Sequence, residues 1–386
     1  MIDFSKIPSP CFVLEEKKLR RNLELIKSVK DNAGCTIILA LKGFSMFSAF
    51  PIVKEYIKGA TSSSLNEARL CFEEMGTKAH VYAPAYREDE WDELMSYTKH
   101  ITFNSLNQWE RFKSKLPSPI GRGSKGEGEE VSCGIRINPQ YSEVTTDLYN
   151  PCIAGSRLGV TAEQIGEKLP QGIDGLHFHS LCESDSFALE RTLKAVEEKF
   201  GHLLHQAKWL NMGGGHLMTR EGYNTEHLIG LVKNIQQKYN VEVILEPGSA
   251  FAWQTGYLRS KVMDLFNSQG INAVILDVSV SAHMPDCIEM PYKPRIWGAT
   301  DAVNNKPAYR MGGLTCLAGD YVGDYSFEKD INIGDDIIFD DMIHYTMVKT
   351  TTFNGVNLPS IGIWKMNDTF QLVRKYGYES YKDRLS

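Results

Sequence analysis

The sequence predicts an α/β fold, a TIM-like (β/α)₈ barrel joined to a second, mainly antiparallel β domain. Between residues 16 and 255, about eight short apolar runs alternate with amphipathic stretches of helical length. Such alternation is typical of a parallel sheet with crossover helices, and eight units favour a closed barrel. After residue 256 the apolar runs are separated by turns instead of helices. The predicted domains are therefore 16–255 for the barrel, and 1–15 with 256–386 for the β-rich domain.

The barrel elements are predicted from hydrophobic periodicity and turn residues. The first helix places Leu19, Leu23 and Ile26 on one face, and the strand TIILALK follows at 36–42. Further strands are expected just before the serines at 62–64 and at 80–85, 100–105, 133–138, 175–180, 209–215 and 241–248. Helices are expected at 65–75, 187–207 and 226–239. The aperiodic segment PSPIGRGSKGEGEE, 117–130, is rich in glycine and charge, which predicts a surface loop.

The β-rich domain is predicted from four runs of strand-forming residues, at 276–281, 308–316, 335–341 and 345–353. The segment SPCFVLE, 9–15, precedes the first helix. We expect it to be a strand of the β-rich domain, so that this domain is assembled from both ends of the chain.

Composition and charge exclude several function classes. The net charge of −6 and the pI of about 6.0 argue against a nucleic-acid surface, which needs a basic stripe. MIDFSKIPSP does not have the pattern of a secretory signal, and no apolar run approaches the roughly 20 residues that span a bilayer. The eight cysteines form no C-x-x-C pair, so neither a zinc ribbon nor a redox dithiol is indicated. We expect a cytoplasmic protein with free thiols, no metal, and a small-molecule partner.

Unusual residues occur where the predicted barrel strands end, which is where barrel enzymes build their active sites. Lys42 ends the first strand inside ILALKGF, and a lysine at a barrel mouth can lose its proton and form an imine, although a snorkelling side chain is the alternative. Glu246 ends a strongly apolar strand and must be paired, either with a cationic ring nitrogen or with an arginine such as Arg157. Gly213, Gly214 and Gly215 could expose amides to a phosphate or simply form a tight turn.

Two further residues are candidates for chemistry. His179 ends the strand GLHFHS, where its flat ring could stack on an aromatic cofactor or be a hydrogen-bonded core residue. His177 is two residues earlier, and we expect the two rings to point to opposite sides of the strand, which argues against a shared metal. Cys316 lies between glycines in GGLTCLAGD, and we expect either an accessible thiol or a buried one.

Taken in order, the motifs ALKGF, HFHS, NMGGGH, EPGS, TCLAGD and YTMVKTTTFNG resemble those of the alanine-racemase-fold (fold type III) decarboxylases that use pyridoxal 5′-phosphate (PLP). The motifs run from residue 42 to about 355, so the resemblance covers nearly the whole chain. It implies an alanine racemase- and ornithine decarboxylase-like fold, and a carboxy-lyase acting on a basic amino acid.

The resemblance also implies roles for individual residues. Lys42 would hold PLP as a Schiff base, His179 would stack on its ring, and Glu246 would pair with the pyridine nitrogen. The phosphate would be held by Gly213, Gly214, Gly215 and Tyr345, with Arg157 a further candidate at the cofactor site. Cys316 would enter from the partner subunit of a head-to-tail homodimer and return a proton to Cα.

Within the superfamily, the chain looks most similar to the carboxynorspermidine (carboxyspermidine) decarboxylases of polyamine biosynthesis. ATSSSLNEA, CLAGD and MPDCIEMPYKP carry this likeness. Leu317 follows the cysteine where ornithine decarboxylases have an acidic residue, and Ser249 replaces their arginine after EPG, which leaves one phosphate contact to be supplied differently.

The resemblance to polyamine decarboxylases suggests a small cationic substrate. Asp286, Glu289 and Asp320 could bind its distal ammonium groups, with solvated surface charge as the alternative. Alternative functions are a diaminopimelate, ornithine or arginine decarboxylase, a racemase, or a non-catalytic PLP-binding homologue.

Overall fold

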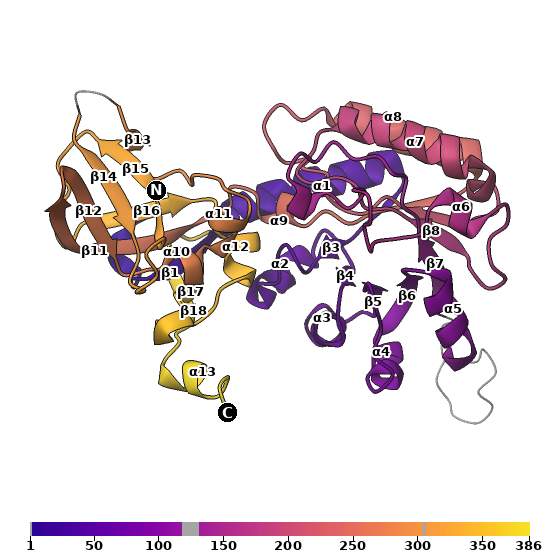
Figure 1. Cartoon of the computed structure of the whole chain (residues 1–386), viewed down its shortest axis with the longest axis horizontal. Helices are drawn as coiled ribbons and strands as arrows, with labels where there is room; N and C mark the ends of the chain where they lie inside the picture. Colours follow the sequence, from indigo (N-terminus) through magenta and orange to yellow (C-terminus); the bar gives the residue numbers. More distant parts are fainter. Residues whose placement is uncertain (1, 118–130, 304–305) are drawn as a thin grey trace. The chain divides into compact units, whose positions relative to one another are not determined.

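A computed structural model describes residues 2–117, 131–303 and 306–386. The chain divides into two compact units (Figure 1), which we term the barrel unit, Asn22–Phe251, and the sheet unit, Met1–Arg21 with Ala252–Ser386. The loop predicted at 117–130 lies, apart from Pro117, outside the described residues.

The barrel unit is built on a parallel sheet that closes on itself. Its nine named strands are ordered β2-β10-β9-β8-β7-β6-β5-β4-β3. β2 and β3 are two consecutive parts of the first barrel strand. The barrel closes there, because β2 pairs with β10 while β3 pairs with β4. The (β/α)₈ prediction is therefore confirmed. The strands are β2 (Thr36–Ile37), β3 (Leu39–Ala40), β4 (Ala60–Ser62), β5 (Ala79–Tyr82), β6 (Thr98–Phe103), β7 (Ser132–Arg136), β8 (Gly175–His177), β9 (Trp209–Asn211) and β10 (Glu242–Leu245).

Helices follow most of these strands. Helix α1 (Glu16–Ala33) precedes the first barrel strand. The longest helices that follow a barrel strand are α7 (Ser186–Leu204) and α8 (Thr225–Tyr239), which lie side by side in Figure 1. Glu197 of α7 joins them by accepting hydrogen bonds from Lys238 and Tyr239. The shorter ones are α2 (Phe50–Val53), α3 (Leu65–Leu70), α4 (Trp91–Ser96), α5 (Leu106–Phe112), α6 (Ala162–Ile165) and α9 (Ser249–Ala252). The helix expected at 65–75 is α3 continued by a π-helical turn at Cys71–Met75.

The amino-terminal half of the barrel interior is filled by side chains. Trp209, the first residue of β9, packs against Ile38 and Ile244 in a buried cluster. Its indole lies over Gly134 and Gly175, where an added Cβ would come within 2.2 Å and 2.0 Å of ring atoms. This packing blocks the amino-terminal end of the barrel interior around Trp209.

The sheet unit carries a mainly antiparallel nine-stranded sheet. β1 (Cys11–Glu15) pairs antiparallel with β11 and parallel with β17, so the amino-terminal segment lies in this sheet, as the sequence predicts. The other strands are β11 (Gly256–Ser268), β12 (Ile271–Leu276), β13 (Ala299–Asp301), β14 (Ala308–Gly312), β15 (Tyr321–Phe327), β16 (Asp336–Asp340), β17 (Ser360–Trp364) and β18 (Phe370–Arg374).

Two strands predicted for the β-rich domain are wrong. Of the segment 276–281, only Leu276 is in a strand, because the Ser279 hydroxyl accepts from the Ala282 amide and caps a short helix, α10 (Val280–His283). The segment 345–353 forms α12 (Tyr345–Val348) and the start of a 3₁₀ turn, η6 (Phe353–Gly355). Helices α11 (Pro285–Glu289) and α13 (Tyr378–Lys382) also belong to this unit.

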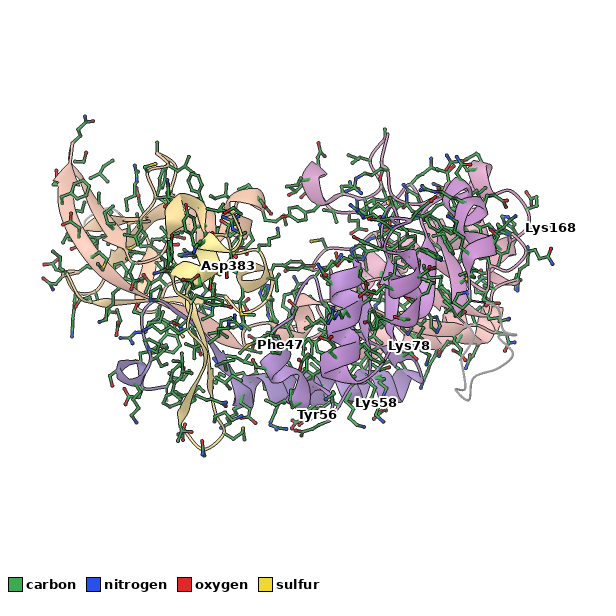
Figure 2. All side chains as sticks on the ribbon, turned by 90° about the horizontal axis from the view of Figure 1, so that it is seen from below. Phe47, Tyr56, Lys58, Lys78, Lys168 and Asp383 are labelled. Carbon is green, nitrogen blue, oxygen red and sulfur yellow. The ribbon has the colours of Figure 1, made fainter. Side chains whose placement is uncertain are left out.

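The surface of the barrel unit carries charged side chains. Lys58 and Lys168 are exposed and point away from the barrel (Figure 2). Within the described ranges, no helix combines the length and the apolar character needed to cross a membrane.

Candidate active site

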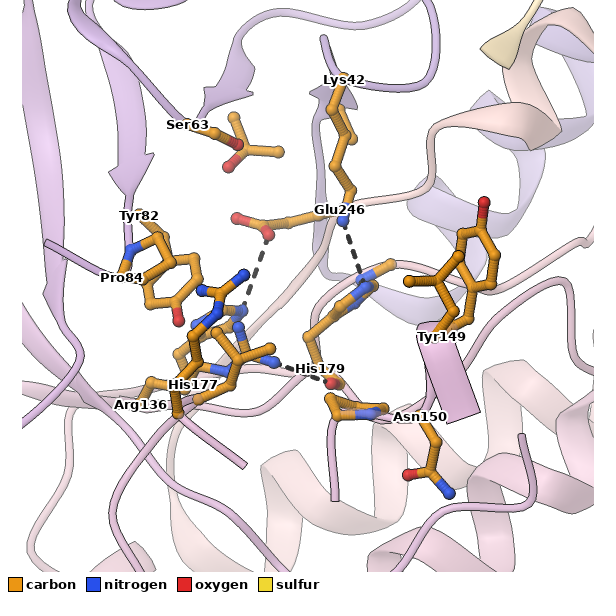
Figure 3. A pocket seen from close by; sticks show the side chains of 17 residues that line it. Lys42, Ser63, Tyr82, Pro84, Arg136, Tyr149, Asn150, His177, His179 and Glu246 are labelled. Carbon is orange, nitrogen blue, oxygen red and sulfur yellow. Dashed lines mark hydrogen bonds and ion pairs between the residues drawn. The ribbon is translucent and has the colours of Figure 1, made fainter. Parts of the chain in front are cut away.

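A cavity of about 300 Å³ opens at the carboxyl ends of the barrel strands. All of its lining residues belong to the barrel unit. They include the predicted Lys42, His179, Gly214, Glu246 and Arg157. Figure 3 shows Lys42, His179 and Glu246 converging in this space. The cavity therefore lies at the end of the barrel where the sequence analysis expects the site.

Lys42 extends into the cavity from the turn after β3. Its Nζ lies 3.3 Å from His179 Nε2 (Figure 3). Lys42 is exposed because its side chain borders the cavity, and the surrounding protein still desolvates the amine. Burial lowers its pKa below the ordinary value, and the Arg136 cation lowers it further, while Glu246 acts in the opposite direction. Lys42 is thus an amine that can lose its proton more readily than a surface lysine can.

His179 is fixed from both sides just after β8. Its Nδ1 accepts a hydrogen bond of 2.8 Å from the Gly214 amide, so the proton of the neutral ring is assigned to Nε2. Its carbonyl oxygen accepts from an Arg136 amino group at 3.1 Å. Burial, together with Lys42 and Arg136, holds the pKa of His179 well below its usual range. The ring is therefore neutral, and its orientation is set by the backbone.

The three glycines allow the chain to pass between the ends of β8 and β10. Gly213 and Gly215 have φ values of +66° and +87°, which favour glycine. A Cβ on Gly214 would lie 2.4 Å from the Glu246 carbonyl oxygen, and one on Gly215 would lie 2.3 Å from that of Leu181. The Gly213 amide donates to Asn211 Oδ1, and the Gly214 amide donates to His179. The backbone amides of Gly213 and Gly214 are therefore already used in hydrogen bonds within the site.

Glu246 is a buried carboxylate that directly follows β10. It is 8% exposed, and its Oε1 accepts from Asn211 Nδ2 at 2.7 Å. Its Oε2 lies 3.7 Å from His177 Nε2, but burial and Arg136 hold the pKa of His177 well below its usual range, so this neighbour is neutral. Burial raises the pKa of Glu246, and Asn211 opposes that shift. The described part of the chain contains no ion pair between Glu246 and an arginine, Arg157 included.

The two histidines of HFHS line the same cavity, contrary to the prediction that they face opposite ways. The prediction was wrong because side chains alternate with a period of two along a strand, so residues two apart, such as His177 and His179, point to the same side. Among the residues that the structure describes, no group of histidine, cysteine and carboxylate side chains could hold a metal.

The remaining candidates belong to the sheet unit. Cys316 is exposed, and its amide and Sγ both lie within reach of Asn354 Oδ1, at 3.2 Å and 3.4 Å. Tyr345 is the first residue of α12 rather than part of a strand. Glu289 is paired with Lys349. Each of these side chains therefore has its immediate surroundings within the sheet unit.

Two buried aspartates of the sheet unit have protein partners. Asp320 accepts from Ser279 and from the Ser281 amide through Oδ1, and from the amide and hydroxyl of Thr315 through Oδ2. Asp286 Oδ2 accepts from Tyr292 and Thr346, while its Oδ1 is shielded from solvent. These contacts leave Asp320 little capacity for a substrate ammonium group, whereas Oδ1 of Asp286 has no hydrogen-bond partner among the described residues.

A sequence profile described as "Pyridoxal-dependent decarboxylase, C-terminal sheet domain" matches residues 79–343. The chain belongs to this decarboxylase family. It is therefore a PLP-dependent carboxy-lyase of the amino-acid type.

Similar decarboxylases match over almost their full length. A carboxyaminopropylagmatine decarboxylase of Synechocystis is 50% identical, over 99% of this chain and 96% of its own. A carboxynorspermidine/carboxyspermidine decarboxylase of Campylobacter jejuni is 44% identical, over 99% of both chains. The structure of carboxynorspermidine decarboxylase from C. jejuni with norspermidine superposes with a TM-score of 0.88 at 43% identity, covering 98% of this chain and 100% of that one. A Helicobacter pylori diaminopimelate decarboxylase, at 15% identity, shares the fold.

The cavity of this decarboxylase fits PLP. Lys42 supplies an amine of lowered pKa for the aldehyde. Glu246 is a buried carboxylate that accepts from Asn211 and lies at the cavity wall, so a cationic ring nitrogen would be an appropriate partner for its charge. The residues thus provide the chemical groups that the cofactor requires.

Sequence reasoning missed two residues of the decarboxylase site. Arg136 is only 3% exposed, and its guanidinium lies 4.7 Å from the centre of the Tyr82 ring. Asn211 links Glu246 to the glycine turn. A signal for both was present, because an arginine and an asparagine in the apolar strands CGIRIN and WLN must have buried partners.

Proposed function

We propose that the protein decarboxylates carboxynorspermidine or carboxyspermidine, giving norspermidine or spermidine in polyamine biosynthesis. The observation that carries the reaction type is the convergence of Lys42, His179 and Glu246 in one cavity. The choice of substrate is supported by two relatives of that name, 44% and 34% identical over 99% and 98% of this chain. It is supported further by the C. jejuni structure that contains norspermidine.

The barrel residues have separate tasks in this mechanism. PLP, when bound, supplies an aldehyde for the substrate amine and a ring that takes up the electron pair left by carbon dioxide. Lys42 would hold the aldehyde, since a lysine of lowered pKa supplies the neutral amine that this bond needs. Glu246 would keep the ring nitrogen protonated, because a nearby negative charge stabilises that cation. His179, with its plane fixed by Gly214, would support one face of the ring.

The proton that replaces the carboxylate at Cα would come from Cys316. The S–H bond breaks, the Cα–H bond forms, and the thiol takes a new proton from solvent before the next cycle. Tyr345, the Gly215 amide and Arg157 are proposed phosphate ligands, whereas Gly213 and Gly214 would shape the turn beside the phosphate, because their amides already donate to Asn211 and His179. Asp286, Glu289 and Asp320 remain proposed substrate contacts, with Glu289 the most accessible of them.

The cavity is lined by barrel residues alone, and Cys316 belongs to the sheet unit, so we propose a homodimer in which the partner chain supplies the thiol. Apolar side chains accompany the exposed Cys316: Leu314 and Phe353 are both 46% exposed, and Leu317 is 47% exposed. A partner surface would remove them from water. We also propose that the enzyme acts in the cytoplasm, in keeping with its free thiols.

A substrate panel tests the proposed reaction. Carbon dioxide release would be measured with carboxynorspermidine, carboxyspermidine, diaminopimelate, ornithine, arginine and carboxyaminopropylagmatine. The last is included because the relative at 50% identity has that name, which makes its substrate the second candidate. That substrate ends in a guanidinium instead of an amine. Turnover of diaminopimelate or ornithine, with the carboxylated polyamines inert, would refute the proposal.

Mixing two variants that are each impaired in amine formation tests the shared site, with formation of the amine product as the activity measured. Lys42→Ala and Cys316→Ala each damage every site of a homodimer. After mixed refolding, random pairing makes half of the dimers mixed, with one intact site in two, so roughly a quarter of wild-type activity should return if sites are shared between chains. No recovery, with mixed dimers demonstrated by mass, would show that each chain uses its own thiol.

A further inference from the structure

The amide side chain of Asn354 contacts Cys316 twice. Its Oδ1 accepts from the Cys316 backbone amide at 3.2 Å and from the thiol at 3.4 Å. The thiol contact is within hydrogen-bond range for sulfur and directs the S–H toward the amide oxygen. The two side chains are separated by 38 positions in the sequence, so this contact depends on the folded sheet unit.

The backbone of the Cys316 loop is fixed by other residues. Asp320 binds the amide and hydroxyl of Thr315, the residue before the cysteine. It also binds Ser279 and Ser281, which begin helix α10. Asp320 therefore fixes the loop next to the cysteine, whereas the two Asn354 contacts fix residue 316 itself.

The backbone at Asn354 explains why an asparagine occupies this position. Its φ of +56° and ψ of +14° lie in the left-handed region, which among residues with side chains favours asparagine and aspartate. The next residue, Gly355, also has a positive φ, +73°. The turn therefore presents a short polar side chain in a backbone conformation that most residues adopt only with strain.

We propose that Asn354 is a positioning residue that directs the thiol of Cys316 for proton delivery. This inference rests on the proposed function, in which the S–H proton passes to Cα as carbon dioxide leaves. By holding the thiol, Asn354 would favour delivery to Cα, which gives the amine product. A misdirected thiol would leave time for a proton to reach the aldehyde carbon of the cofactor instead. Water would then hydrolyse the C=N bond to the substrate, which would release a carbonyl product and leave the cofactor in its amine form.

Two variants separate the side chain from the backbone. Asn354→Gly removes the acceptor and adopts the left-handed conformation easily. Asn354→Asp keeps both the conformation and an acceptor oxygen. Asn240→Gly is the matched control, since Asn240 is also left-handed, with φ +55°, at the end of α8. If Asn354→Gly does not fold, Asn354→Ser, whose hydroxyl is too short to reach, replaces it.

Two readouts are used on the full-length holoenzyme. The first is the rate at which iodoacetamide alkylates Cys316, measured by peptide mass spectrometry. Losing one hydrogen bond should make Asn354→Gly react roughly two- to tenfold faster. The second is the ratio of amine to carbonyl product, which should fall in Asn354→Gly with KM unchanged. Asn354→Asp should restore most of the ratio, and Asn240→Gly should match the wild type in both readouts.

An unchanged product ratio in Asn354→Gly would overturn the inference, whether or not alkylation changed, because contact without an effect on proton delivery is only structural. Cys316→Ala separates the role of Asn354 from the role of the thiol. If Cys316→Ala lowers the ratio and Asn354→Gly does not, only the role of Asn354 fails. If Cys316→Ala also leaves the ratio unchanged, the proposed function of the thiol fails.

Discussion

Asn211→Asp tests whether the ionisation of Glu246 controls the reaction. In the wild type, Asn211 Nδ2 donates to Glu246 at 2.7 Å, while Asn211 Oδ1 accepts from the Gly213 amide at 2.8 Å. An aspartate keeps the acceptor for Gly213, so the glycine turn is retained. It replaces the donor with a second carboxylate next to the first.

The size of the effect follows from the lost hydrogen bond. A hydrogen bond to a charged group contributes about 1.5–3 kcal/mol, and about 1.4 kcal/mol corresponds to one pH unit. Loss of the donor alone should therefore move the ionisation of Glu246 upward by about one to two pH units. Repulsion between adjacent carboxylates acts in the same direction. Burial already raises the pKa of Glu246, so the variant extends an existing shift.

The assay is the pH dependence of kcat/KM. If Glu246 must be ionised, activity falls as the pH decreases through its pKa, and the acid limb in Asn211→Asp should lie roughly two pH units or more above that of the wild type. Activity should recover at alkaline pH. Asn32→Asp, on the exposed face of α1, is the control for an added charge. An acid limb that does not move, in a variant that still binds cofactor, would refute the role of Glu246.

Two other predictions concern stability. Gly214→Ala should destabilise the fold by roughly 3 kcal/mol in urea unfolding, since its Cβ would meet a backbone oxygen. The control Gly230→Ala, which has open space in α8, should be neutral or stabilising by about 1 kcal/mol. Equal unfolding midpoints for the two variants would contradict this prediction. Folding lowers the pKa of Lys42, so the unfolded chain binds the extra proton and apoprotein stability rises toward pH 10.5. Lys42→Met should therefore be more stable than the wild-type apoprotein at low pH, and this gain should disappear near pH 10.5.

The barrel could be predicted from the sequence because its signals are local and repeated. Each apolar run is bounded by turn residues, and long helices such as α7 have a clear hydrophobic face. The β-rich domain was harder to predict. Its segment 345–353 contains four threonines, which favour strands, yet Thr346 lies in a helix where its hydroxyl binds Asp286. A contact between residues 60 positions apart therefore outweighs the local preference.

The convergence of side chains in the cavity was predictable where unusual residues follow strand ends, as for Lys42, His179 and Glu246. It was not predictable where a side chain's partners come from distant segments. The acidic character of Asp320 suggested a cationic ligand, but its partners include Ser279 and Ser281, which are about 40 residues away in sequence. Sequence alone also gave no indication that Asn354 contacts Cys316. Such contacts depend on how the sheet unit packs.

The divided first strand has a consequence for the order in which the enzyme is made. Lys42 follows β3 near the beginning of the barrel sequence, whereas Glu246 follows β10, the last strand. The two are brought into one cavity only when β10 pairs with β2. During synthesis, Lys42 therefore leaves the ribosome early as a solvated amine. The cavity around Lys42 is complete only after β10 has been synthesised. Cofactor capture should accordingly follow barrel closure, so a nascent chain that ends before β10 should not acquire the cofactor.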